Sequence, residues 1–311
     1  MKTRLSPAVA RLKSYAGWLL VALIMGYLAH VIIANRDSLT ALTIQPAHLA
    51  VHVALIGAYF SLLLLAWVIV VRGTAMSVSG GQAALIWLLA NAGKYVPGKV
   101  LMIGGRVILL QRAGCRIADT VMATTIEHMM LLFAALPLTL YGISLGIRVP
   151  SLVAYALVAL ASLALLTLVL WPTALTSLAN RALRWAQRPP LSAPIDRLQL
   201  LQLLGLYFLA WLCYGVSAVA IVHAVGLANV IPMTFLLGIS VAAWTIGFFA
   251  IITPGGLGVR EAVFAGFLVQ YVSQAEAVAC ALLFRLTWTM VEWAGVALGA
   301  GLSWRKPERE I

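Results

Sequence analysis

Long runs of apolar residues recur along the chain, with short polar intervals between them. A transmembrane α-helix needs about 20 consecutive apolar residues. We expect each run of this length to cross a bilayer as a helix, because a helix pairs its own backbone N–H and C=O groups where water is absent. The runs of sufficient length are 16–34, 50–71, 120–147, 150–171, 200–225 and 276–303.

Two further apolar regions are interrupted by residues that break helices. Region 82–111 contains the stretch NAGKYVPGK, and region 231–273 contains TPGGLG. Proline and glycine commonly end a helix. Since 82–92 and 259–273 are short for a full span, we expect two re-entrant helical hairpins, although charge alone leaves full double crossings open.

The order of these elements predicts the architecture. In each half, a broken hairpin is associated with a long helix that carries an acidic residue, Glu127 in the first half and Glu292 in the second. Inverted repeats whose broken helices meet near the middle of the bilayer are typical of secondary transporters. We therefore predict an all-α, polytopic membrane bundle of about six full spans plus two hairpins, in a single domain of residues 1–311.

Composition supports a membrane protein. Hydrophobic residues make up 63% of the chain and charged residues 10%, whereas soluble domains contain roughly a half and a quarter. The net charge of +12 would suggest a nucleic-acid partner in a soluble domain. Here the basic residues stand at the ends of apolar runs, as the positive-inside rule describes, so we expect no nucleic-acid binding.

The charge of the intervals predicts the orientation. Basic residues concentrate in the tail 1–14, in 112–119, in 172–199 and after the last run, whereas 35–49 and 226–230 carry little charge. We expect the basic segments and both termini on the cytoplasmic side of a bacterial inner membrane, in a multi-pass protein. The first run is expected to remain as a span rather than to be cleaved as a signal.

The cytoplasmic interval 172–199 contains an amphipathic stretch at 174–188. Arginines occupy one side of this stretch and apolar residues the other. A helix of this kind lies on the membrane surface. A solvated linker helix remains an equal alternative.

Ionisable residues inside or beside the apolar regions are candidates for a functional site, because they are costly in a membrane. Arg285 and Glu292 are spaced to share one helical face, which must meet protein or water. A structural ion pair with a neighbouring helix is the alternative reading of these two residues. The candidate substrate-binding residues are Lys94, Lys99, Arg106, Glu127, Arg260, Glu261, Arg285 and Glu292.

The helix breaks suggest what such a site binds. A half-helix that begins at a break presents free N–H groups and a partial positive charge. With several cations nearby, we expect an anion site, and the most available anion in a membrane is a lipid phosphate. The break residues are Pro97, Gly98, Thr253, Pro254, Gly255, Gly256 and Gly258.

Other motifs point away from catalysis. Residues 93–99 fit most of a P-loop, but Val100 stands where Ser or Thr would hold magnesium. His48 and His52 lack an evident third metal ligand, so we interpret them as interfacial polar residues. We expect no nucleotide, no metal and no other cofactor. Gly142 and Gly146 have the spacing of close helix packing.

The two interrupted stretches also carry a resemblance. GKYVPGK at 93–99, Arg106, Glu127 and TPGGLGVRE at 253–261 resemble the lysylphosphatidylglycerol synthase transmembrane family across nearly the whole chain. In bifunctional members, a cytosolic domain aminoacylates a lipid and the membrane domain moves the product across the bilayer. This chain ends at Ile311 without such a domain, so the resemblance implies lipid translocation without synthesis.

The resulting expectation is a flippase or scramblase that moves an anionic phospholipid or a polyprenyl-phosphate-linked glycolipid. The alternative is a membrane enzyme or an assembly factor that acts on lipid-linked envelope glycans. A transporter is favoured over an enzyme. Membrane lipids are the expected partners, a lipid-modifying synthase or a glycosyltransferase is a further candidate, and self-association into a homo-oligomer is left open.

Overall fold

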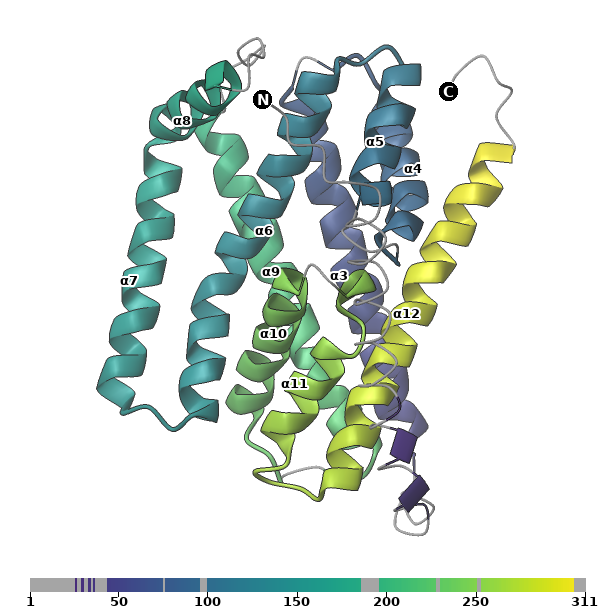
Figure 1. Cartoon of the computed structure of the whole chain (residues 1–311), viewed down its shortest axis with the longest axis vertical. Helices are drawn as coiled ribbons and strands as arrows, with labels where there is room; N and C mark the ends of the chain where they lie inside the picture. Colours follow the sequence, from purple (N-terminus) through teal and green to yellow (C-terminus); the bar gives the residue numbers. More distant parts are fainter. Residues whose placement is uncertain are drawn as a thin grey trace, which may run out of the picture.

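The protein is a bundle of long helices, shown in Figure 1. The computed structural model describes residues 44–74, 76–95, 100–185, 196–227, 230–250 and 253–304, with isolated positions between 26 and 36. No strand occurs in these residues, which confirms the predicted all-α polytopic bundle. The long helices are α3 (Pro46–Arg72), α6 (Ile117–Gly146), α7 (Ser151–Leu170), α9 (Arg197–Ala224) and α12 (Gln274–Trp304).

Four of these helices, α3, α6, α9 and α12, are long and apolar enough to cross a membrane. Helix α7 is also predicted to span, and its apolar part, Ser151–Thr167, is shorter. It contacts the bundle through a narrow stripe that includes the buried Ala154 and Ala161, while Leu152 and Leu160 are exposed. Such a surface suits lipid contact. The predicted span 16–34 lies largely outside the described residues.

Hydrogen bonds at both ends hold α3 and α9 antiparallel. At one end, the amide of Gln45 donates to the carbonyl of Ala224 at 2.7 Å. At the other end, Gln199 Nε2 donates to the carbonyl of Ile69 at 2.9 Å. We call these two ends of the bundle the Gln45 end and the Arg72 end.

The predicted hairpins are present and enter from opposite ends. Helices α4 (Gly80–Asn91) and α5 (Val100–Arg112) lie in the upper half of Figure 1, at the Arg72 end, and α10 (Met233–Phe249) and α11 (Val259–Leu268) lie in the lower half. The four arms contain 12, 13, 17 and 10 residues. All are shorter than the roughly 20 residues of a full span, which favours re-entrant hairpins over double crossings.

The turns of the two hairpins meet inside the bundle. The 3-10 turn η1 (Ala92–Tyr95) contacts the 3-10 turn η3 (Pro254–Gly256). Residues Pro97 and Gly98 lie outside the described part of the chain. The second turn depends on glycine, since Gly255, Gly256 and Gly258 have φ values of 58°, 72° and 81°, which side chains rarely tolerate.

Where the structure describes them, the basic intervals lie at the Arg72 end. Figure 1 places α8 (Pro172–Trp185) and the end of α12 there. The interval before α6 is also at this end, because Thr120 Oγ1 lies 3.9 Å from Met76 Sδ. In α8, Arg181, Arg184 and Trp185 are exposed. The contact of this helix with the membrane surface stays a prediction.

Small residues let helices approach closely, as the glycine spacing predicts. A Cβ atom on Gly142 would overlap the backbone of Gly238, and one on Gly146 would overlap the ring of Phe267. His52, which was predicted to be an interfacial polar residue, is fully buried in the protein. Its Nδ1 lies 2.9 Å from the carbonyl of Ser217 and its Nε2 lies 2.6 Å from Thr287 Oγ1, so it joins α3 to α9 and α12.

Candidate functional site

Two cavities adjoin one another where the hairpin turns meet. The larger, which we call the central cavity, has a volume of about 80 Å³ and is lined from both hairpins and from α3, α6 and α12. The smaller, the α11 cavity, has a volume of about 20 Å³ and lies between α9, α10, α11 and α12. Arg260 and Trp288 line both cavities. The polar and charged residues of the central cavity are Asn91, Lys94, Arg106, Glu127, His128, Arg260 and Glu292.

Arg106 and Glu127 form a buried ion pair between α5 and α6. Trp87 Nε1 also donates to Glu127 Oε1 at 2.7 Å, and the guanidinium carbon of Arg106 lies 4.5 Å from the ring centre of Trp67. A buried charge is tolerated when it is paired and further hydrogen-bonded. This group therefore fixes the first hairpin against α3 and α6.

Lys94 and Glu292 form a second ion pair, which joins η1 to α12. The Lys94 ammonium also lies 3.8 Å from the ring centre of Trp288, within the range of a cation–π interaction. The tip of the first hairpin is thus attached to the last helix by a charge and by an aromatic face.

Arg285 and Glu261 form a third ion pair, between α12 and α11. Arg285 Nε lies 3.2 Å from Glu261 Oε1, although the angle is unsuitable for a hydrogen bond, and Arg285 Nη2 donates to the carbonyl of Gly255 at 3.5 Å. Arg285 and Glu292 therefore have different partners, even though they lie on one helix. This pair anchors the second hairpin.

Arg260 differs from these cations because it has no carboxylate partner among the described residues. Its buried Nε has no hydrogen-bond partner. The guanidinium carbon lies 4.9 Å from the ring centre of Trp244 and 5.5 Å from that of Trp288. The guanidinium is therefore held by aromatic faces and its donors remain available.

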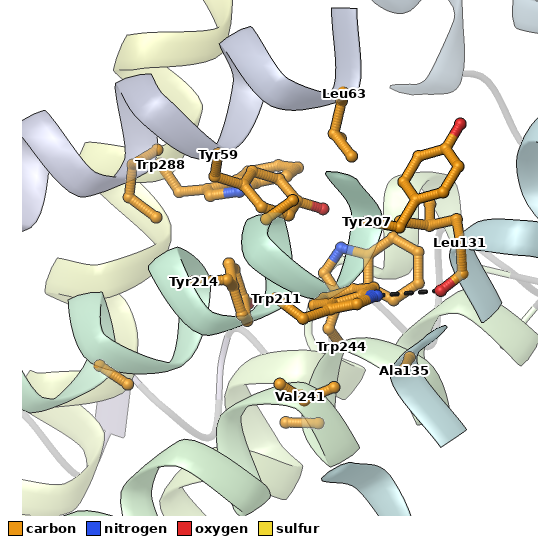
Figure 2. Close-up of a cluster of buried hydrophobic side chains, with 14 of the residues drawn as sticks. Tyr59, Leu63, Leu131, Ala135, Tyr207, Trp211, Tyr214, Val241, Trp244 and Trp288 are labelled. Carbon is orange, nitrogen blue, oxygen red and sulfur yellow. Dashed lines mark hydrogen bonds between the residues drawn. The ribbon is translucent and has the colours of Figure 1, made fainter. Parts of the chain in front are cut away.

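Two indole donors beside Arg260 are also unused. The Nε1 atoms of Trp244 and Trp288 are buried without a hydrogen-bond partner. Figure 2 shows both side chains in the aromatic cluster with Tyr59 and Tyr214. Buried donors without partners are rare, and here they line the same cavity as a cation without a carboxylate. Arg260, Trp244 and Trp288 therefore bring several hydrogen-bond donors, and no carboxylate partner for Arg260, to one cavity.

The local backbone explains how Arg260 reaches this position. Arg260 is the second residue of α11, which begins after Gly258. A Cβ atom on Gly247 would overlap the stem of Arg260, and one on Gly256 would lie 2.9 Å from Arg260 Nε. The first turn of α11 contributes Arg260 and Glu261 to the cavity linings. Glycine at both positions lets the side chain lie flat across the hairpin.

The structure brings together most of the residues predicted as the site: Lys94, Arg106, Glu127, Arg260, Glu261, Arg285 and Glu292. Lys99 lies outside the described residues. The aromatic residues were missed, because tryptophan in membrane proteins usually marks the interface. His128, which lies 2.7 Å from the Thr124 carbonyl through Nδ1, was missed as well. One sequence feature could have indicated Trp244 and Trp288: both lie well inside apolar runs rather than at their ends.

Comparison with known proteins identifies the family of this chain. A sequence profile described as the lysylphosphatidylglycerol synthase TM region matches residues 2–299. The chain belongs to this family. No curated protein matches the sequence.

The motifs shared with the lysylphosphatidylglycerol synthase transmembrane family fall at the hairpin turns. The GKYVPGK stretch includes part of η1, and the TPGGLGVRE stretch forms η3 and the start of α11. Membership implies a membrane-embedded, lipid-related role. Arg260 belongs to the second of these stretches, and Lys94 belongs to the first.

Proposed function

We propose that this member of the family moves a lipid with an anionic phosphate across the bilayer, as a flippase or scramblase. The observation that carries the proposal is Arg260, a cation without a carboxylate that lies between two cavities and beside two unused indole donors. A phosphate in the membrane interior costs several kcal/mol unless donors replace its water. Arg260, Trp244 and Trp288 supply such donors.

The other charges favour an anionic substrate over a cationic one. Each nearby carboxylate already has a cation: Glu127 has Arg106, Glu292 has Lys94 and Glu261 has Arg285. A cationic headgroup would have to displace one of these partners. A phosphate can bind Arg260 without breaking any pair. Phospholipids and polyprenyl-phosphate-linked sugars both provide this group.

The two cavities that Arg260 lines are small. Cavities of about 80 and 20 Å³ are small beside the roughly 300 Å³ or more of typical ligand pockets. Passage of a headgroup past Arg260 therefore requires the hairpins to separate. The Lys94–Glu292 pair links the first hairpin to α12 and the Arg285–Glu261 pair links the second, so we expect these pairs to loosen in turn during transport.

A substrate panel in proteoliposomes tests the proposal. The purified protein is reconstituted with trace fluorescent phosphatidylglycerol, with a matched fluorescent phosphatidylcholine, or with a radiolabelled polyprenyl-phosphate sugar. Movement between leaflets is followed by dithionite quenching for the fluorescent lipids and by enzymatic access for the sugar. We expect at least one anionic lipid to move faster than phosphatidylcholine. No movement above protein-free vesicles, or equal rates for all lipids, would contradict the proposal.

A further inference from the structure

A third cavity lies between α3, α4 and α12, on the side of the central cavity. It has a volume of about 310 Å³, and we call it the lateral groove. Its rim includes exposed residues such as Ser61 and Leu298, the latter 68% exposed. The groove is lined by Gly57, Phe60, Ser61, Leu64, Trp87, Leu88, Asn91, Val291, Glu292, Ala294, Gly295, Val296 and Leu298.

The lateral groove adjoins the central cavity. Phe60, Trp87, Asn91 and Glu292 line both spaces. These residues come from the same helices, α3, α4 and α12, that form the walls of the groove. These shared side chains therefore separate the two spaces, and their movement would join them.

Polarity falls along the groove from its inner to its outer part. Glu292 at the inner end is buried and charged, and it pairs with Lys94. The outer part is formed by apolar residues such as Leu64 and Leu298. The hydroxyl of Ser61 donates to the carbonyl of Gly57 at 2.8 Å, so it adds little polarity to the wall. An amphiphile fits this gradient with its polar end inward.

The groove is open beside Gly57 on α3. A Cβ atom on Gly57 would meet nothing within 4 Å. On the facing side, a Cβ atom on Gly299 would lie 2.9 Å from Leu88 Cβ and one on Gly295 would lie 3.4 Å from Leu88 Cδ2. α12 and α4 thus touch at Leu88, while the space beside Gly57 stays free.

We infer that the lateral groove holds a hydrocarbon chain of the transported lipid while its phosphate lies at Arg260. This inference rests on the proposed function, because it requires a lipid headgroup in the central cavity. It adds the place where the chain leaves the protein, between α3 and α12. The chain then stays in apolar surroundings, and only the headgroup enters the polar site.

Side chains that fill the groove test this inference. Gly57→Ala, Gly57→Leu and Gly57→Phe form a graded series at a position with free space, and Ser61→Phe is a second site in the same wall. The matched control is Gly205→Phe on α9, an exposed position that is also open. The probe is headgroup-labelled N-NBD-phosphatidylethanolamine, which keeps natural chains and a single phosphate charge, in phosphatidylethanolamine–phosphatidylglycerol vesicles.

We expect Gly57→Phe and Ser61→Phe to slow translocation by roughly tenfold or more. Gly57→Leu should slow it less. Gly57→Ala and the control Gly205→Phe should translocate lipid at nearly the wild-type rate. Thermal unfolding in detergent should be unchanged, which separates a filled groove from a misfolded protein. Wild-type rates in both Phe variants would overturn the inference while leaving the proposed function intact.

If the wild-type protein moves no lipid, the proposed function is refuted. A second measurement then tests separately whether the lateral groove holds an acyl chain. Phosphatidylglycerol with a photoreactive group on its acyl chain is crosslinked in the same vesicles and the adducts are mapped. Adducts on the groove residues of α3 and α12 would support the inference if Gly57→Phe abolishes them. Adducts spread evenly over α7 and other exposed helices, or disulfides between Gly57→Cys and cysteines placed in 16–34, would overturn it.

Discussion

The guanidinium of Arg285 on α12 and the carboxylate of Glu261 on α11 form an ion pair, with 3.2 Å between Nε and Oε1. Arg285 is 9% exposed and Glu261 is 2% exposed. The pair stands directly beside Arg260, the neighbour of Glu261 in sequence. The carboxylate of Glu261 is therefore paired with Arg285, and Arg260 has no carboxylate partner among the described residues.

Loss of one partner of this pair should destabilise the fold. Arg285→Gln or Glu261→Gln leaves the other charge buried without compensation, at a cost of about 3 kcal/mol. The double variant removes both charges and should recover most of the loss in melting temperature. The measurement is thermal unfolding in detergent. Single variants as stable as the wild type would show that the pair has no structural role.

The contact of α6 with α10 should be intolerant of side chains at Gly142. A Cβ atom there would overlap the Gly238 backbone, and overpacking typically costs about 1–3 kcal/mol. We expect Gly142→Leu to lower the melting temperature clearly. Gly205→Leu, at an open position, is the control and should have little effect. Equal melting temperatures of the two variants would mean that the helices do not cross at these glycines.

Cysteine labelling should report the predicted orientation. Ile147 lies between α6 and α7 at the Gln45 end, and Gln111 lies at the Arg72 end of α5; both are exposed. An impermeant maleimide on intact cells should label Ile147→Cys and should label Gln111→Cys only after permeabilisation. Leu257→Cys, in the turn of the second hairpin, should react more slowly than either. Labelling of Gln111→Cys in intact cells would reverse the orientation.

Cys115, the native cysteine nearest in sequence to Gln111, should contribute little background labelling. Cys115 is buried, and this burial raises the pKa of its thiol. The reactive species is the thiolate, so less of it is present at neutral pH than for an ordinary cysteine. Labelling of the unmodified protein at Cys115 should therefore be slow at pH 7 and should increase as the pH rises. Fast labelling at pH 7 would mean that residues 113–116 leave the thiol of Cys115 exposed to solvent.

The positioning of Arg260 should depend on Gly247. A methyl group at Gly247 would overlap the stem of Arg260, so Gly247→Ala should shift the guanidinium from its place between Trp244 and Trp288. We expect slower lipid movement, by roughly tenfold, with a smaller change in melting temperature than Gly142→Leu causes. A melting temperature that falls as far as in Gly142→Leu would instead assign Gly247 to packing.

The helices could be predicted because their signal is local. The run 50–71 corresponds to α3, Pro46–Arg72, and the breaks at Pro254 and Gly255 correspond to the turn η3. Bilayer thickness fixes the length of a span, and proline and glycine interrupt helices wherever they stand. Both rules act on neighbouring residues, so the sequence reveals them directly.

The pairing of the charges could not be predicted in the same way. The spacing of Arg285 and Glu292 suggested one shared environment, but their partners are Glu261 and Lys94, from different hairpins. Which hairpin faces which part of α12 depends on how the helices pack. For the same reason, nothing local indicated that Trp244 and Trp288 would lie beside Arg260.

The most direct measurement of the central claim is the rate of phosphatidylglycerol movement in proteoliposomes for Arg260→Gln and Arg260→Lys. Arg260 forms no ion pair in the described part of the chain, so neither change leaves a carboxylate unpaired and both variants should unfold near the wild-type temperature. We predict that Arg260→Gln loses movement by roughly a hundredfold, since a charged hydrogen bond to phosphate is worth about 1.5–3 kcal/mol, and that Arg260→Lys retains part of it. Wild-type rates in a stably folded Arg260→Gln protein would contradict the claim that Arg260 holds the lipid phosphate.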